Sequence, residues 1–221
     1  MGELEPSVSP SGPLTLHEAL REARHDWLDL EHGALGTLID MTVRPAKVMR
    51  AYLYERRRDY VRPLRYLLFS VAAQVAASYA LLSSAFMQEQ VQKQGEEVAR
   101  AHWLLDNAAV LTLVLLPLIA GVLRLCFMRH GVRYVDALVV ATYSQAQLNL
   151  FAAALVAPAA YFGGLVLPAV LGTLTLVYAV YAWASFPSVG RWWTRTLLAV
   201  LALLLCQGLN SALVWLVMRW M

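Results

Sequence analysis

Polar side chains inside an apolar segment are the residues of this sequence best suited to chemistry. The segment 136–157 is apolar enough to cross a membrane, yet it carries the polar residues Asp136, Thr142, Tyr143, Gln145, Gln147 and Asn149. At helical spacing Asp136, Tyr143 and Gln147 share one face. Gln145 and Asn149 share a neighbouring face, and Gln207 and Asn210 form a second patch in a later apolar segment.

Two interpretations of these residues stay open. Polar groups in hydrocarbon need partners, so the segment 136–157 should be buried among other helices. In the first interpretation its polar faces and the patch at Gln207 and Asn210 line a cavity for a lipid headgroup or a small solute. In the second they form hydrogen bonds between helices, worth about 0.6 kcal/mol each. Asp136 is expected to pair with Arg124 and to hold two spans together.

A basic block is the second candidate site. It contains eight basic residues, opposed only by Glu55 and Asp59, namely Arg44, Lys47, Arg50, Arg56, Arg57, Arg58, Arg62 and Arg65. Pro45 suits the first position of a helix, predicted to run to about Asp59. Such a helix would present a cationic and an apolar face, which favours the membrane interface and anionic phospholipid. The alternative is that the block only orients the first span.

The sequence gives little support for an enzyme or a metal site. His25, Asp29 and His32 have a spacing that could place metal ligands on one helical face, but they equally suit a solvated face. No nucleophile elbow, zinc-protease motif or phosphate-binding loop occurs. We therefore expect a protein that is not an enzyme and has neither metal nor cofactor.

Composition places these residues in a membrane protein. Of the 221 residues 59% are hydrophobic and 15% are charged, and the mean hydropathy is +0.53. Soluble domains have roughly 45–50% apolar and about 25% charged residues. The formal net charge is +3, but the charges cluster at the ends of apolar segments. This pattern favours a membrane surface over nucleic acid as the partner.

The predicted fold is all-α, an integral membrane bundle of five transmembrane helices. A disordered tail is expected over 1–13, cytoplasmic amphipathic and interfacial helices over 14–62, and the transmembrane domain over 63–221. The five spans are predicted at about 64–87, 108–128, 136–157, 160–186 and 196–218. Charges flanking these spans alternate between basic and acidic or neutral. This predicts a cytoplasmic N-terminus and an outside C-terminus.

The segment before the first span resembles a known family. The residues that carry the resemblance are Arg44, Pro45, Val48, Tyr52, Leu53, Arg56, Arg58, Tyr60, Pro63 and Leu64. Their pattern is similar to that of a bacterial membrane family of unknown function, DUF3667. The resemblance implies a bacterial inner membrane but no reaction or substrate. Relatives often have a zinc ribbon, which this chain lacks. The five-span plan also resembles the Yip family of trafficking proteins, at the level of fold alone.

Two functions follow as hypotheses. The first is a lipid-binding scaffold or accessory subunit of the inner membrane, which holds anionic phospholipid through the basic block. Its partner would be another membrane protein or a second copy of the chain. The second is a small transporter or lipid scramblase that uses a polar cavity between spans three and five.

Overall fold

A computed structural model of the chain describes residues 33–55, 60–82, 103, 107–162 and 166–220. Within these ranges every regular element is a helix, and no strand occurs. The elements are a short helix Gly33–Val43, α2 (Pro45–Arg50), a π-helical turn η1 (Ala51–Glu55), α3 (Pro63–Leu82), α6 (Ala108–Phe127), a 3₁₀ turn η2 (Met128–His130), α7 (Tyr134–Phe162), α8 (Val166–Ser185) and α9 (Trp192–Trp220). The predicted all-α class is confirmed.

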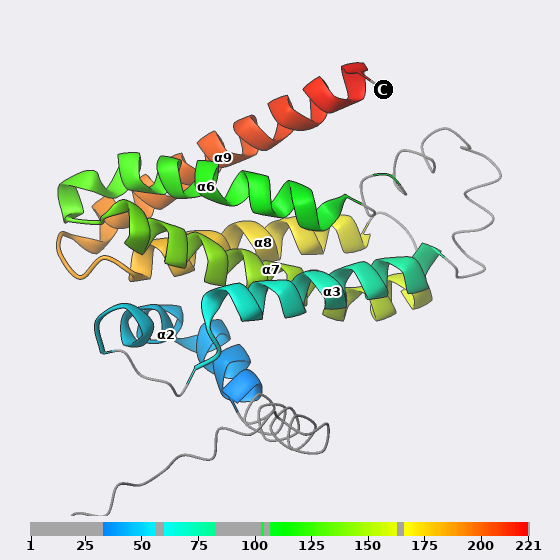
Figure 1. Cartoon of the computed structure of the whole chain (residues 1–221), viewed down its shortest axis with the longest axis horizontal. Coiled ribbons are helices and arrows are strands. Elements are labelled where there is room, and N and C mark those ends of the chain that lie inside the picture. Colours follow the sequence, from blue (N-terminus) through cyan, green and yellow to red (C-terminus); the bar gives the residue numbers. More distant parts are fainter. Residues whose placement is uncertain (1–32, 56–59, 83–102, 104–106, 163–165, 221) are drawn as a thin grey trace, which may run out of the picture.

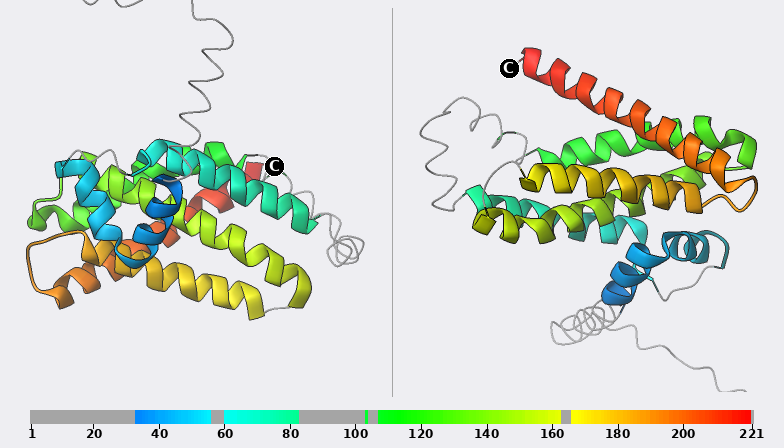
Figure 2. Two further views of the ribbon diagram at one scale, coloured as in Figure 1. Left: turned by 90° about the horizontal axis from the view of Figure 1, so that it is seen from below. Right: turned by 180° about the vertical axis from the view of Figure 1, so that it is seen from behind.

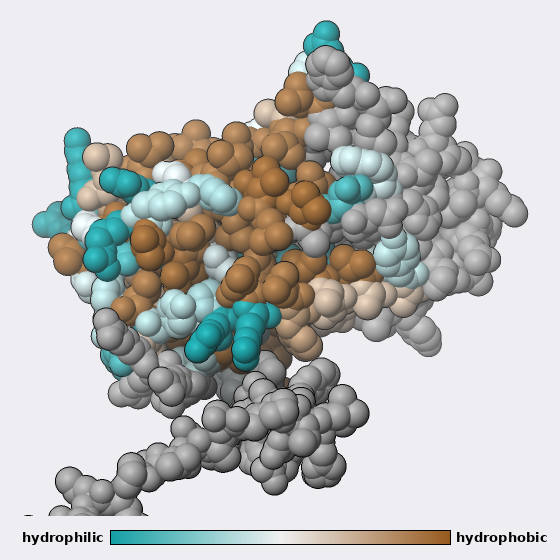
Figure 3. All heavy atoms as spheres, in the orientation of Figure 1, coloured by the Kyte–Doolittle hydropathy of each residue, from teal (hydrophilic) through white to brown (hydrophobic). Residues whose placement is uncertain are grey.

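The five long helices form one bundle around α7. This helix packs against α3, α6 and α8, and α9 packs against α6 and α8. Figure 1 shows these helices running alongside one another, and Figure 2 shows from behind that the C-terminal half of α9 diverges from the others. Figure 3 shows apolar side chains over much of one face of the bundle, as expected for contact with lipid.

The number of spans is corrected from five to four in the part of the chain that the structure describes. Helices long and apolar enough to cross a membrane occupy Pro63–Leu81, Val110–His130, Tyr134–Leu155 and Trp192–Leu213. The predicted fourth span corresponds to α8, which is not among them. Side chains of α8 are described only from Gly172 onward, and that stretch alone is too short for a span.

Prolines and glycines account for several helix ends, and for one error in prediction. Pro45 begins α2, as predicted, and Pro63 begins α3. Gly131 closes the turn after η2 with a left-handed φ of 75°. Pro158 was expected to lie in a break between spans, but α7 continues through it to Phe162. Neighbouring membrane helices can compensate the hydrogen bond that a proline removes.

The described residues of 33–62 form one unit, here called the N-terminal motif. Figures 1 and 2 show it lying against one side of the bundle rather than among the long helices. The helix predicted from Pro45 to about Asp59 is confirmed as far as Glu55, with a change from α-helical to π-helical hydrogen bonding at Ala51, and residues 56–59 lie outside the described residues. The apolar face predicted for it is buried, since Val48 and Met49 are fully inaccessible.

Two turns meet at the end of the bundle where the N-terminal motif docks. A Cβ atom added to Gly190, between α8 and α9, would lie 2.8 Å from Nε2 of His130 in η2. The turn after α6 and the turn after α8 are therefore in contact. Gly190 also has a left-handed φ of 97°, so both its conformation and the close approach of the His130 ring require glycine.

Candidate functional site

A cavity of about 300 Å³ lies among the long helices. All five contribute to it, and its polar or sulfur-bearing lining residues are Gln74 of α3, Thr112 of α6, Gln145 and Asn149 of α7, Thr175 and Trp183 of α8, and Cys206, Gln207 and Asn210 of α9. None of the described lining residues is charged. The cavity can therefore offer hydrogen bonds but no ion pair.

The cavity lies near the middle of the bundle's length. At 1.5 Å per residue, Gln145 is about 16 Å along α7 from its first residue, and Gln207 is about 22 Å along α9. Both helices begin at the same end of the bundle (Figure 1). Since the hydrocarbon layer is about 30 Å thick, these amides lie close to its middle.

Hydrogen bonds fix the α7 wall of the cavity. The Gln145 side-chain NH₂ donates to Oδ1 of Asn149 over 3.0 Å, and Nδ2 of Asn149 donates to the Ser70 hydroxyl over 3.4 Å. Ser70 in turn donates to the carbonyl of Leu67 over 2.7 Å. The Asn149 side chain is only 4% exposed. Because it bonds to Ser70 of α3 and to Gln145 of α7, both helices set its orientation.

Trp183 adds a donor without a partner. Its side chain is 5% exposed and lines the cavity, and its buried Nε1–H has no hydrogen-bond acceptor among the described residues. A buried donor without an acceptor costs about 1–3 kcal/mol. Because this nitrogen atom is itself inaccessible, a molecule in the cavity would not reach it.

Helix α7 presents its polar residues in two directions. Four residues predicted to form a cavity, Gln145, Asn149, Gln207 and Asn210, do line this one. Tyr143 and Gln147 instead contact the N-terminal motif and the start of α3. The Tyr143 hydroxyl donates to the carbonyl of Val61 over 2.7 Å, and Nε2 of Gln147 donates to Oγ1 of Thr42 over 2.9 Å. The hydroxyl of Tyr66 donates to Oε1 of Gln147.

Asp136 lies apart from both groups, at the start of α7. Its carboxylate accepts hydrogen bonds from the backbone N–H and the guanidinium of Arg133, at 3.0–3.2 Å. The predicted pairing with Arg124 is therefore wrong, and Arg124 is exposed. A carboxylate in the first turn of a helix is well placed to accept from N–H groups just before it. Asp136 thus stabilises the beginning of α7.

The N-terminal motif is held to α8 by tyrosines. The Tyr178 hydroxyl donates to the carbonyl of Met41 over 2.9 Å, and the Tyr181 hydroxyl donates to that of Val43 over 2.6 Å. These carbonyls belong to the last turn of the Gly33–Val43 helix, where no further turn supplies donors. The two tyrosines therefore satisfy two of the last carbonyls of that helix, and Gln147 contacts the side chain of Thr42 in the same turn.

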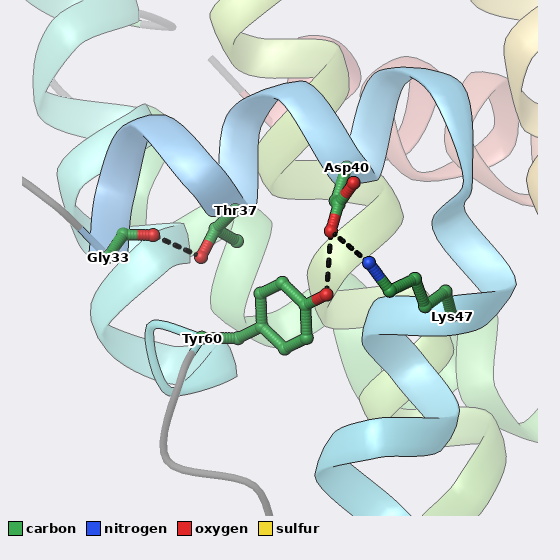
Figure 4. A network of polar contacts seen from close by, with 5 residues as sticks. All are labelled: Gly33, Thr37, Asp40, Lys47 and Tyr60. Atoms are coloured by element: carbon green, nitrogen blue, oxygen red, sulfur yellow. Dashed lines mark hydrogen bonds and ion pairs between the residues drawn. The ribbon is translucent and has the colours of Figure 1, made fainter.

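A polar network also holds the motif together internally (Figure 4). Oδ2 of Asp40 accepts from Nζ of Lys47 over 2.8 Å and from the Tyr60 hydroxyl over 2.6 Å. These two donors, Lys47 first, hold the pKa of the Asp40 carboxyl below its usual value. Thr37 accepts from the backbone N–H of Val61 and donates to the carbonyl of Gly33.

The residues of the basic block have different environments. Arg50 donates to the carbonyls of Ser185 and Phe186 at the end of α8, and Lys47 pairs with Asp40. Arg44, Arg62 and Arg65 are exposed. The remaining three residues of the block, Arg56, Arg57 and Arg58, lie outside the described residues, as do His25, Asp29 and His32. Among the described residues no three His, Cys, Asp or Glu side chains come together as a metal site.

Sequence reasoning missed the partners of Arg50, Tyr178 and Tyr181. Each contact joins residues at least 135 positions apart. The sequence indicates only that the last carbonyls of each helix need cationic or hydroxyl donors. It does not indicate which residue supplies the donor.

The comparisons agree with the resemblance seen in the sequence. The model of the family described as "Protein of unknown function (DUF3667)" matches residues 32–75, about a fifth of the chain. This segment covers the N-terminal motif and about the first two thirds of α3. No curated protein and no solved structure matches the chain.

Proposed function

We propose that this multi-pass membrane protein, with its DUF3667 segment docked on one side, is a small non-enzymatic transporter of uncharged polar molecules. The observation that carries the proposal is the cavity of about 300 Å³ midway along the bundle, whose described lining includes several polar side chains and no charged one. Secondary transporters commonly bind their substrates at this depth.

The lining and size of the cavity narrow the class of substrate. An ion near the middle of the hydrocarbon needs an opposite charge or several oriented dipoles, whereas a neutral molecule needs only hydrogen bonds. Amides such as those of Gln145 and Gln207 both donate and accept, which suits hydroxyl and amide groups. The volume is far above the roughly 10–15 Å³ that a single water molecule requires, so the cavity has room for several waters or one small polyol.

A swelling assay in proteoliposomes tests this proposal, with glycerol and urea as probes. Gln207→Leu removes an exposed amide that lines the cavity, so it should lower the glycerol flux at least about fivefold with the fold intact. Ser211→Leu is the matched control, because Ser211 is exposed on the same helix but does not line the cavity. Fluxes of both probes equal to those of protein-free vesicles would contradict the proposal. Equal fluxes in wild type and both variants would also contradict it.

A lipid-binding scaffold is the second candidate, favoured by the exposed surface of the N-terminal motif. Leu35, Ile39 and Val43 recur every four residues and are 58–63% exposed. Arg62 and Arg65 are also exposed, at the start of α3. An apolar stripe near cationic side chains suits the interface of an anionic leaflet.

Fluorescence quenching tests this second candidate. A bimane on Ile39→Cys should be quenched by doxyl lipids in anionic vesicles. The additional changes Arg62→Gln and Arg65→Gln should weaken that quenching. Quenching unaffected by these two changes would count against a role for the arginines in lipid binding.

A further inference from the structure

A second, larger hollow lies between α8 and α9. It has a volume of about 650 Å³ and is lined mainly by apolar side chains, among them Val177, Val180, Val200 and Leu204. Trp192, Arg195 and Ser185 lie at the end of this groove nearest the α8–α9 turn. The groove is therefore apolar along its length and polar at one end.

The length of the groove corresponds to one leaflet. From Trp192 to Leu204 the rise along α9 is about 18 Å, slightly more than half of a 30 Å hydrocarbon layer. The exposed fractions of Val177 and Leu204 are 63% and 65%, so these walls are open to the surrounding membrane. A chain entering from the polar end would extend towards the middle of the bilayer.

The polar end is basic and aromatic. Arg191 is exposed, and Arg195 donates through Nη1 to the carbonyl of Pro187. Nε of Arg195 is buried and has no acceptor among the described residues. The rings of Trp192 and Trp193 stack with centroids 3.8 Å apart, and both are more than half exposed. Tryptophan at this depth marks the headgroup level of a membrane.

Nearby carboxylates do not cancel the positive charge at this end of the groove. The described acidic residues of the N-terminal motif and of α7 are engaged: Asp136 by Arg133, Asp40 by Lys47, and Glu55 also has an interaction partner. The contact of His130 with Gly190 brings the α6–α7 turn, which carries exposed Arg129, next to the α8–α9 turn. A phosphate at Arg191 and Arg195 would therefore meet a net positive surface.

We propose that the α8–α9 groove binds an anionic phospholipid of the adjoining leaflet. Its phosphate contacts Arg191 and Arg195, and one acyl chain lies along Val177, Val200 and Leu204. This lipid site is distinct from the basic block of the N-terminal motif. The proposal of this lipid site does not depend on whether a solute passes through the polar cavity.

The site would also affect the polar cavity. Leu203 lines both the groove and the cavity, so its side chain forms a shared wall. An acyl chain that reaches this depth packs against Leu203 from the groove side. The bound lipid therefore completes the apolar side of the wall that separates the cavity from the membrane.

Electron spin resonance on the full-length protein in nanodiscs tests the proposal, with doxyl-labelled phosphatidylglycerol and phosphatidylcholine as probes. Phosphatidylglycerol should associate several-fold more strongly. Arg191→Gln should weaken its association about fivefold, the effect of one basic residue beside an anionic lipid. The control Arg129→Gln changes an exposed arginine of the neighbouring turn, which adds to the local positive charge without contacting the phosphate, and it should weaken the association much less.

A second pair of variants tests the path of the acyl chain. Leu204→Trp fills the groove and should lower the immobilised fraction of both lipids. Leu205→Trp should not, because Leu205 is half exposed but does not line the groove. Equal association of the two lipids would overturn the proposal, as would equal effects of Arg191→Gln and Arg129→Gln. If Leu204→Trp fails to fold, the comparison of Arg191→Gln with Arg129→Gln tests the proposal.

Discussion

Arg50 donates hydrogen bonds to the carbonyl oxygens of both Ser185 and Phe186. The distances are 2.9 Å to Ser185, and 2.6 and 3.0 Å to Phe186. The final carbonyls of a helix lack partners within it and carry partial negative charge, which a guanidinium complements well. The family-related segment near the N-terminus therefore completes the end of α8. Stability of the N-terminal motif and of the bundle should be coupled through this contact.

Arg50→Gln should lower the free energy of unfolding by about 2 kcal/mol. The variant loses hydrogen bonds donated by a charged group, and two carbonyl oxygens are left without a donor. Arg50→Lys should recover only part of this, since an ammonium lacks the planar fork that reaches both oxygens. Thermal unfolding in detergent measures the effect. Arg44→Gln, at an exposed arginine of the same motif, is the control. A similar loss of unfolding free energy in Arg50→Gln and Arg44→Gln would refute the coupling between the motif and the bundle.

Tyr178→Phe should destabilise the docked motif by about 1 kcal/mol, because the buried carbonyl of Met41 loses its donor. Hydrogen exchange should rise over the Gly33–Val43 helix more than elsewhere. Tyr54→Phe is the matched control, since Tyr54 is 59% exposed. A uniform rise over all helices would show that Tyr178 does not act on the motif specifically.

The Asp40 network should make part of the motif's stability pH-dependent. The pKa of Asp40 is lowered by Lys47 and Tyr60, so its contribution is fully present above the unfolded pKa of about 4 and lost as pH falls through the folded value. Asp40→Asn should lower Tm by a few degrees between pH 6 and 8. The difference should shrink below about pH 4. A difference that stays constant down to pH 3 would contradict the assignment.

Gly190→Ala should destabilise the protein more than Gly131→Ala. Both glycines have left-handed φ values, which cost an alanine about 1–2 kcal/mol. Only at Gly190 would the new Cβ also meet a side chain, that of His130, whereas nothing lies within 4 Å at Gly131. Thermal unfolding of the two variants compares them. An equal loss of stability in Gly190→Ala and Gly131→Ala would mean that the His130 ring moves away from the new Cβ at no cost.

Single cysteines at Val189 and Arg129 should react with an impermeant reagent from the same side of the membrane, because their turns touch. We expect that side to be the cytoplasm, since exposed Arg62, Arg65 and Arg191 lie at this end. Cys126 and Cys206 would first be replaced by alanine. Labelling from opposite sides would contradict the contact between the two turns.

The sequence predicted those features that depend on local pattern. Hydropathy predicted the four candidate spans, together with a fifth at α8 that is not among them, and Pro45 predicted the start of α2. Helical spacing separated Gln145 and Asn149 from Tyr143 and Gln147. Partners could not be predicted in the same way. Asp136 pairs with Arg133 rather than Arg124, and Arg50 with the end of α8, because such choices depend on how helices pack. The path of α7 through Pro158 likewise depends on its neighbours.

The contact between Tyr181 and Val43 bears on the order of biosynthesis. These residues are 138 positions apart, so a ribosome adding about 5–20 residues per second needs roughly 7–28 s between them. During that interval the carbonyls of Met41 and Val43 lack their tyrosine donors. Docking of the motif can therefore be completed only after α8 has emerged, which makes its completion a late step of assembly and a motif without its tyrosine contacts a mark of an unfinished chain.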